Sequence, residues 1–450
     1  MLKFVKVSPV WIAFFQKFLE APLNLGPVSD HPNVPSEVRI RKRGIPIAHS
    51  LEKFFGELIL SFLDLAVNQE ADTLLYRFHD DLWVVGQPER CAKAWQSMEK
   101  FGKIMGLEFN MRKTGSAYLT SEGVPRDNKI AAVLPKGPVT FGFLTLQESS
   151  GLWVINDSEV DAHVIQLQKQ LGACSSVLKW VATWNSCIGR FFSHNFGEPA
   201  NCFGRQHVDA ILKTHRRMQE RIFDGKNGNG TSLADHLKKI IAVRFGLTDV
   251  PDAFIYMPEQ LGGLGVRNPF ISGLLVRSNV YADPKVRMHT FLAGEKKIYE
   301  RARRDFEEQE ERDRRRLFHK IYTNEYGTET SHLSIQESER NTFFSMEEFT
   351  AHREALSSSL CFAYTDLMRT PTQEGVRISV KVKDAMAKHA ELQAELDLEN
   401  LDRETKWLIQ QHSEELFERC GNLSMVDKSL LPLGILTILR KKKVSWQMVL

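Results

Sequence analysis

Hydrophobic side chains recur at helical spacing in two places near the start of the chain. Apolar positions between Trp11 and Leu19 repeat with the period of an α-helix, and the run SLEKFFGELILSFLDLAV over 50–67 does so more strongly. The first pattern predicts a short amphipathic helix. The second is apolar around most of its circumference and predicts a buried helix.

The pattern then changes from helical spacing to two short apolar runs. Leu74–Phe78 and Leu82–Val85 are rich in strand-forming residues, and His79, Asp80 and Asp81 separate them. Two such runs with a short polar connection predict a β-hairpin. The acidic residues are expected at its turn.

Further alternation extends this region to about residue 156. The sequence predicts a helix over Pro88–Met105 that ends near Gly106, then a strand and turn in LEFNMRKTGSAYL over 107–119. Pro138–Leu146 and Leu152–Ile155 predict a second hairpin. Helices that alternate with hairpins indicate an α+β domain with an antiparallel sheet.

From about residue 159 the pattern is mainly helical. GKNGNGTS over 225–232 predicts a flexible break, and two polar helices are expected over 300–320 and 383–418. The mixed charges of 300–320 favour a solvent-exposed helix with local ion pairs over a nucleic-acid contact.

Composition narrows the class of protein only moderately. With 450 residues the chain is long enough for two or three domains, and 42% apolar with 26% charged residues is typical of a soluble globular protein. A net charge of +3 permits nucleic-acid binding without indicating it. Six scattered cysteines without a CxxC pair argue against a zinc site and favour reduced thiols and an intracellular location, with nucleus and mitochondrion both open. No apolar run is long enough to span a membrane.

The adjacent carboxylates Asp80 and Asp81 are the main candidate for chemistry. Two like charges at a hairpin turn repel each other, and a divalent cation would offset that repulsion. Mg²⁺ prefers oxygen ligands and is usually held by one or two carboxylates together with substrate phosphates. The alternative is a plain polar turn, because aspartate is common in turns.

Four motifs in sequence order favour the metal-binding interpretation. FHDD in a hairpin resembles the aromatic-x-Asp-Asp motif of reverse transcriptases, and RGIPIAHSLEKFFGELILSFLD resembles the family's glycine-x-proline turn and following helix. GLEFNMRKTGSAYL resembles the next palm motif, and VTFGFLTL resembles the hairpin that grips the primer. The resemblance covers roughly residues 10–150 and is greatest to fungal or group-II-intron-related elements.

The resemblance implies a fold and a division of the chain. We expect a partial polymerase palm of the α+β class over 1–156, an antiparallel sheet with helices. A mainly α-helical thumb-like region is expected over 157–290, and a charged helical C-terminal extension over 291–450. RNA template and DNA primer are the implied partners, with Mg²⁺ or Mn²⁺ as cofactor and no membrane.

The family's functional residues carry over onto matching positions. Asp80 is the implied metal ligand and Asp81 its weaker partner. Gly44, Pro46 and Lys113 are implied at the incoming nucleotide, although Ile47 and Ala48 replace the family's usual glutamine and glycine. The implied nucleic-acid contacts are Arg39, Arg41, Lys42, Arg43, Phe78, His79, Phe141 and Gly142.

One part of the family pattern has no match. The first palm strand and its metal-binding aspartate should precede the Gly44 turn, but MLKFVKV contains no carboxylate and Asp30 follows no apolar strand. We therefore expect the chain to begin midway through the palm, and to bind metal weakly and not polymerise alone. Three explanations stay open. The sequence comes from a truncated gene model, from a pseudogene remnant, or from a split protein that a missing N-terminal segment completes in trans.

Three functions remain as alternatives. The chain is a piece of an RNA-directed DNA polymerase, a non-catalytic nucleic-acid-binding protein, or a helical scaffold whose charged helices bind other proteins. The sequence contains no HExxH, GxSxG, P-loop lysine or EF-hand motif that would point to another chemistry.

Overall fold

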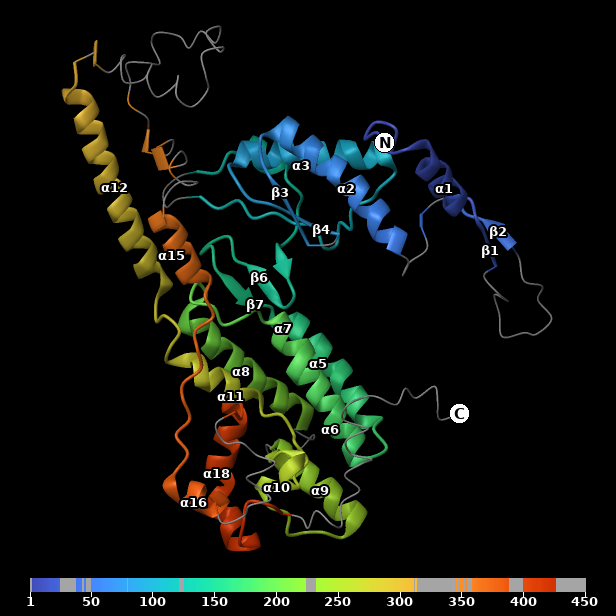
Figure 1. The fold of residues 1–450 in the computed structure, drawn as a ribbon, viewed down its shortest axis with the longest axis vertical. Helices are drawn as coiled ribbons and strands as arrows, with labels where there is room; N and C mark the ends of the chain where they lie inside the picture. Colours follow the sequence, from blue (N-terminus) through green and yellow to red (C-terminus); the bar gives the residue numbers. More distant parts are fainter. Residues whose placement is uncertain are drawn as a thin grey trace. The chain divides into compact units, whose positions relative to one another are not determined.

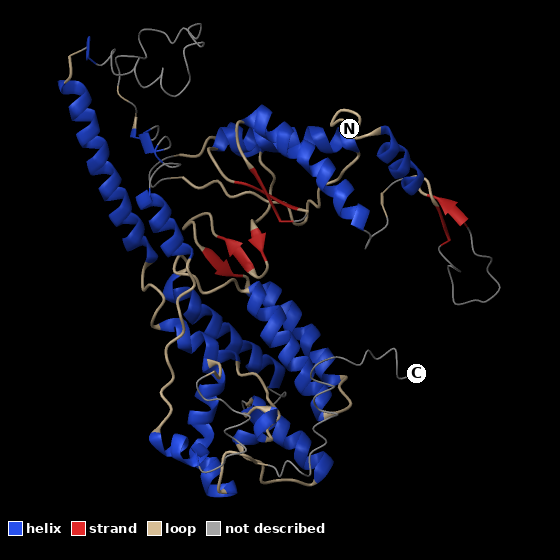
Figure 2. Ribbon diagram, in the orientation of Figure 1, coloured by secondary structure: helices blue, strands red, loops and turns tan. Residues whose placement is uncertain are grey.

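The computed structural model forms two compact units, Met1–Pro138 and Val139–Leu450 (Figure 1). Each unit is described by itself. The described residues are 2–24, 38–42, 44–45, 50–78, 80–120, 125–223, 232–310, 312–313, 343, 345–346, 349–350, 353, 358–387 and 400–425. Helices dominate and the described strands are short (Figure 2), so the expected α+β class is confirmed in its broad form.

The first unit contains four helices and two separate strand pairs among its described residues. Its elements are α1 (Pro9–Leu19), β1 (Pro22–Asn24), β2 (Val38–Ile40), α2 (Ser50–Ala71), β3 (Leu75–Phe78), β4 (Asp81–Val84), α3 (Pro88–Met105) and α4 (Asn128–Val133). Both strand pairs are antiparallel, and they do not join into one sheet. The helices predicted over Trp11–Leu19, 50–67 and Pro88–Met105 and the hairpin predicted around Asp80 are all confirmed.

The core of this unit lies between the paired helices α2 and α3 and the β3–β4 hairpin. Leu63 and Val67 of α2 pack with Trp95 of α3, and Leu75 and Leu82 of the hairpin pack against this cluster. Apolar residues of α2 recur three to four positions apart on this face, which explains why the run is helical here. The cluster fixes which face of the hairpin is buried.

The strand predicted within 107–119 is wrong. This segment has no regular secondary structure, because it closes α3 instead of pairing with a strand. The Leu107 N–H donates to the Gly102 carbonyl past a left-handed Gly106, and the ring of Phe109 packs 5.3 Å from that of Trp95. The hydrogen bond is that of a glycine-capped helix end.

The second unit begins with a three-stranded antiparallel sheet and continues as helices. The sheet contains β5 (Thr140–Phe141), β6 (Leu144–Leu146) and β7 (Trp153–Ile155) in that order. The helical elements are α5 (Asp157–Gly172), α6 (Val177–Ser186), the π-helix η1 (Cys187–Phe192), α7 (Ser193–Asn195), α8 (Gly204–Phe223), α9 (Leu233–Phe245), α10 (Asp252–Tyr256), the 3₁₀ turn η2 (Glu259–Leu261), α11 (Pro269–Arg277), α12 (Pro284–Glu308), α15 (Ser358–Met368), α16 (Val380–Ala387) and α18 (Arg403–Cys420). The flexible break predicted over 225–232 lies outside the described residues, apart from Ser232.

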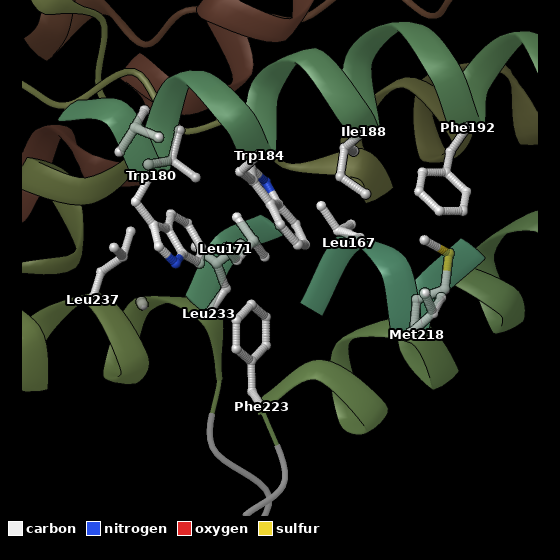
Figure 3. Close-up of a cluster of buried hydrophobic side chains, with 14 of the residues drawn as sticks. Leu167, Leu171, Trp180, Trp184, Ile188, Phe192, Met218, Phe223, Leu233 and Leu237 are labelled. Carbon is white, nitrogen blue, oxygen red and sulfur yellow. The ribbon is translucent and has the colours of Figure 1, made fainter. Parts of the chain in front are cut away.

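A large aromatic core holds these helices together. Figure 3 shows one face of the continuous α6–η1 helix turned toward α5, α8 and α9, with Trp180 and Trp184 stacked at 5.8 Å. The indole N–H of Trp184 donates to the Arg267 carbonyl at 3.0 Å, so this buried donor is satisfied. The buried side chains labelled there are Leu167, Leu171, Trp180, Trp184, Ile188, Phe192, Met218, Phe223, Leu233 and Leu237.

The boundary between the units differs from the one expected at residue 156. Phe143, between β5 and β6, is buried in the helical core, and its N–H donates to the Asn195 carbonyl. Gly142 has a left-handed φ of 57°, and a Cβ there would lie 2.7 Å from the same Asn195 oxygen. The hairpin predicted over Pro138–Leu146 and Leu152–Ile155 is a three-stranded sheet, and it belongs to the second unit.

The C-terminal part is not a separate extension that begins at residue 291. Ile409 and Leu416 of α18 share a buried cluster with Met257 and Leu261, and the Met425 N–H donates to the Leu261 carbonyl. The later helices therefore complete the core around α10 and η2. Described residues up to 425 belong to the same unit as α5.

The two long helices predicted for this region have other bounds in the structure. Residues 400–402 are not helical, and the Asp402 carboxylate accepts from the Thr405 N–H as the N-cap of α18, so one helix cannot run from 383 to 418. The helix expected over 300–320 forms the end of α12 up to Glu308 and is interrupted at 309–310, which are not helical. Residues 312–313 are helical, and most of the rest lies outside the described residues. Among the described residues, no helix combines the length and apolarity needed to cross a membrane.

Candidate functional site

The acidic hairpin owes its geometry to alternation along β3. Leu75 and Arg77 face inward and are partly buried, whereas Tyr76 and Phe78 are exposed on the outer face. Side chains directly opposite each other in an antiparallel pair share a face. The register pairs Phe78 with Asp81, so Asp81 belongs to the exposed outer face.

Asp80 and Asp81 occupy the end of the hairpin. Asp80 lies in the turn, Asp81 is the first residue of β4, and both are exposed. The predicted position of the two carboxylates, at the tip of a hairpin backed by helices, agrees with the structure. His79 lies outside the described residues.

The acidic residues around the hairpin fall into two groups with different partners. Arg77 donates from Nε to both carboxylate oxygens of Asp64 at 3.0 Å and from Nη1 to Glu57 at 2.9 Å, which ties β3 to α2. Asp80 and Asp81 have no ion pair with another described residue. Their negative charge is therefore uncompensated by the described part of the unit and available to a cation.

The oxygens of Asp80 and Asp81 are of the type that a hard cation binds, but few ligands surround them. Carboxylate oxygens are the ligands that Mg²⁺ and Mn²⁺ take in proteins. Within the described residues, however, no group of three or more His, Cys, Asp or Glu side chains is placed to hold a metal. Asp80 and Asp81 are the residues that would hold such an ion. The ion would offset the negative charge of phosphate oxygens placed next to it.

Among the described residues, no hydrogen bond or ion pair joins those predicted at the incoming nucleotide to the carboxylates. Gly44 is exposed and has a left-handed φ of 72°, as a turn before α2 requires, and Pro46 lies outside the described residues. Lys113 is exposed, and its N–H donates to the Asn110 carbonyl in the turn that follows α3. No hydrogen bond or ion pair among described residues links Lys113 with the hairpin.

One residue of the predicted basic run, Arg41, has a structural role within the first unit. Arg41 donates from Nη2 to the carbonyls of Phe18 at 2.8 Å and Leu19 at 3.3 Å, and its guanidinium lies 5.6 Å from the Phe18 ring. It thereby satisfies the C-terminal end of α1. Lys42 is exposed, Arg39 is described only as a backbone position of β2, and Arg43 lies outside the described residues.

Phe141 and Gly142, predicted at the primer, belong to the other unit. Phe141 is the last residue of β5 and is 47% exposed, and Gly142 forms the tight turn against Asn195. Both residues lie in the sheet of the second unit, whereas the two carboxylates lie in the hairpin of the first unit. The residues of the four motifs are thus divided between two separately packed bodies.

A pocket in the second unit escaped prediction from the sequence. It has a volume of about 300 Å³ and lies among α5, α6, α8 and α9. Its wall includes Trp180, Phe223, His236, Cys174 and Arg244, which are widely spread along the chain. A Trp or His within a helical pattern is most simply interpreted as a core residue, so no sequence signal marked the group.

Known proteins provide no relative for comparison. No protein-family model, no curated protein and no solved structure matches the chain significantly. Function is therefore inferred from the side chains that the fold places together.

Proposed function

We propose that this chain is a reverse-transcriptase-like protein that binds a primer–template duplex and does not extend a primer by itself. The observation that supports this function is the β3–β4 hairpin, which presents at its turn two carboxylates that have no ion-pair partner among the described residues. Glu57 and Asp64, on α2, are both ion-paired with Arg77. The carboxylates of Glu57 and Asp64 thus hold the hairpin to α2, whereas Asp80 and Asp81 have no ion pair with another described residue.

The order of elements in the first unit supports the same proposal. Gly44, with its left-handed φ, precedes the long helix α2, the acidic hairpin follows it, and α3 packs with the hairpin in one buried cluster. This is the order in which the reverse-transcriptase motifs were matched. The bound duplex would supply phosphates, and its affinity would come mainly from basic side chains of the protein and fall as salt is raised.

The lack of polymerisation follows from the chemistry of the carboxylate pair. Two-metal phosphoryl transfer clamps two cations about 3.5–4 Å apart on the attacking and leaving oxygens. Two adjacent aspartates project in different directions from the backbone, so few of their oxygens converge on one ion. Two cations cannot be held by this pair alone.

Primer extension and duplex binding by the full chain test the proposal together. The chain, its Asp80→Ala variant and a Glu99→Ala control are incubated with primed RNA, nucleotides and Mg²⁺ or Mn²⁺. Glu99 is an exposed carboxylate of α3 in the same unit, so the control loses the same charge away from the hairpin. We expect no extension by any of the three, and duplex binding that weakens with salt in all of them.

Two results would contradict the proposal. Extension that Asp80→Ala abolishes and Glu99→Ala preserves would show a complete polymerase. No binding of the duplex even at low salt would instead remove nucleic acid as the ligand.

A chain that does not bind the duplex would favour the helical scaffold. The exposed apolar side chains of the α12–α15 pair support this alternative. These two helices contact each other, yet Met288 and Leu292 of α12 and Phe362, Tyr364 and Met368 of α15 remain 48–66% exposed. Clustered apolar exposure is typical of protein-binding surfaces. A chain without duplex affinity whose Phe362→Ser variant loses self-association in sedimentation would support the scaffold.

A further inference from the structure

Helix α1 of the first unit has an apolar face that is open to solvent. Val10, Trp11 and Phe14 are 78%, 57% and 48% exposed. Phe14 follows the other two by three and four positions, so the three side chains share one face of the helix. Phe4, in the turn that precedes α1, is 78% exposed as well. Exposed apolar side chains that cluster in this way are typical of a surface that binds a protein or a membrane.

The neighbouring side of α1 attaches the helix to the core and thereby fixes the exposed face. Phe15 is the buried residue of α1, and its ring lies 5.0 Å from that of Phe54 and 5.2 Å from that of Phe55, both in α2. The rings of Trp11 and Phe14 lie 5.9 Å and 5.7 Å from that of Phe15, so they continue this aromatic cluster to the surface. The apolar face is therefore in place before any partner binds, which lowers the entropic cost of binding.

The charged side chains around this face have one sign. The segment 2–19 contains Lys3, Lys6 and Lys17, all of them exposed, and no aspartate or glutamate. Lys17 follows Phe14 by three positions, so its side chain is next to the apolar face. This part of the surface is suited to a partner that is both apolar and negatively charged.

The ends of α1 do not reverse this charge. The first turn of the helix, where backbone N–H groups carry partial positive charge, contains no acidic residue. At the other end, Arg41 donates to the carbonyls of Phe18 and Leu19 and offsets their partial negative charge. Glu20 follows α1, and its carboxylate accepts a hydrogen bond from Nε2 of Gln16 at 3.1 Å on a different side of the helix.

The combination of side chains favours a lipid surface over a protein partner. Helices that lie in the interface of an anionic bilayer carry tryptophan, phenylalanine and leucine on one face and lysine or arginine beside it. A tryptophan such as Trp11 sits at the level of the lipid head groups, because its ring is apolar and its N–H is polar. The cores of protein–protein interfaces are instead depleted of lysine.

We propose that α1 and the turn before it bind the surface of a bilayer that contains anionic lipids. The α1 surface consists of apolar side chains that enter the interface and of lysines that face lipid phosphates, namely Phe4, Val10, Trp11, Phe14, Lys3, Lys6 and Lys17. The helix lies on the bilayer and does not cross it. This partner differs from the absence of a membrane that the reverse-transcriptase resemblance implied, and it is independent of Asp80 and Asp81.

Sedimentation of the full chain with lipid vesicles tests the proposal. The vesicles are sucrose-loaded and consist of phosphatidylcholine alone or with about 30% phosphatidylserine, which supplies the anionic surface. Val10→Asp and Lys17→Gln change the α1 surface. The matched controls are Ile104→Asp and Lys103→Gln in α3 of the same unit, where Ile104 is 72% exposed and Lys103 is also exposed.

We expect the parent chain to bind the anionic vesicles at least about tenfold more tightly than the neutral ones, because each lysine near an anionic surface changes the affinity about fivefold. Lys17→Gln should weaken binding to the anionic vesicles about fivefold for the same reason. Val10→Asp should weaken it by about tenfold or more, because it removes an apolar side chain from the interface and adds a negative charge. Ile104→Asp and Lys103→Gln should bind like the parent chain.

Four results would overturn the proposal. The first two are no sedimentation with anionic vesicles at millimolar lipid and equal binding to anionic and neutral vesicles. The third is binding that Val10→Asp and Lys17→Gln leave unchanged, which would place the lipid contact elsewhere in the chain. The fourth is self-association without lipid that Val10→Asp abolishes, in place of vesicle binding, which would assign the face to a second copy of the chain. Circular dichroism of each variant confirms that loss of binding is not loss of fold.

Discussion

The two units bury their apolar surface to different extents. In the first, a small cluster around Leu63, Val67 and Trp95 backs a two-stranded sheet whose outer residues Tyr76 and Phe78 are 56% and 62% exposed. In the second, stacked tryptophans and phenylalanines from helices far apart in the chain form one large core. An isolated pair of strands has only marginal stability in water, whereas an interdigitated helical core is robust. The exposed carboxylates of the hairpin therefore belong to the unit with the smaller buried cluster.

The largest expected effect lies in the core of the second unit. Trp184 is fully buried, and its Ala variant loses both packing and the hydrogen bond to the Arg267 carbonyl. Truncation of a buried tryptophan costs about 4 kcal/mol. We expect Trp184→Ala to lower the urea midpoint strongly, with hydrogen exchange showing the loss in α5, α6 and α8 and not in α2 and α3.

Leu178→Ala is the control for this experiment, because Leu178 is on the same helix and 54% exposed. Its change should stay within about 0.5 kcal/mol. Similar losses in the two variants, or a loss of exchange protection in α2 and α3, would contradict the contrast between the units.

A second effect, nearly as large, comes from acid. Burial lowers the pKa of His215 to about 4, and its Nδ1 has no hydrogen-bond partner among the described residues. Between the ordinary pKa of 6.5 and about 4, the unfolded chain binds a proton here that the folded chain does not, so stability falls as pH decreases through this window. The loss should approach about 3 kcal/mol near pH 4 and level off below it.

His215→Leu sharpens this test, since leucine fills the site without a group that must be protonated. The variant should unfold at a midpoint that depends less on pH between 6.5 and 4, whereas the exposed His194→Leu should behave like the parent chain. A pH dependence that survives in His215→Leu would place the acid sensitivity elsewhere, with His207 and His236, whose pKa values burial also lowers, as the next candidates.

Local signals in the sequence specified much of the first unit. Pro88 and Gly106 mark the ends of α3 because proline suits the first helical turn and glycine adopts the left-handed conformation after the last. The two apolar runs around Asp80 and Asp81 specified the hairpin. In each case the residues that decide the structure are neighbours in the chain.

Contacts between distant residues were not predictable in the same way. The 107–119 segment forms no strand because Phe109 packs on Trp95, and the C-terminal helices join the second unit because Ile409 and Leu416 meet Met257 and Leu261. The pocket is a similar case, since Cys174, Phe223 and Arg244 converge only after four helices have packed. Periodicity indicates that a face is buried, but it does not indicate what covers that face.

A smaller effect is expected from the ion pairs that join the hairpin to α2. Arg77 is 18% exposed and bridges Asp64 and Glu57 across two elements, whereas Arg90 is 53% exposed and pairs with Asp72. Arg77→Met should destabilise by about 1 kcal/mol, because Arg77 pairs with two carboxylates and the screening by water is weaker at this less exposed side chain. Arg90→Met should have almost no effect in the same thermal unfolding assay. Equal effects would mean that the hairpin is not held to α2 by this bridge.

The smallest expected effect concerns the carboxylates themselves and addresses the proposed function most directly. A cation that binds only the folded chain stabilises it by RT ln 2, about 0.4 kcal/mol, at a concentration equal to its dissociation constant. Mg²⁺ at tens of millimolar, at constant ionic strength, should therefore raise the thermal midpoint of the parent chain slightly. Asp80→Asn should remove that increment, and Glu99→Gln should retain it. If Asp80→Asn and the parent respond equally, the turn holds no cation, and the exposed hairpin of the first unit is a polar turn with no part in metal chemistry.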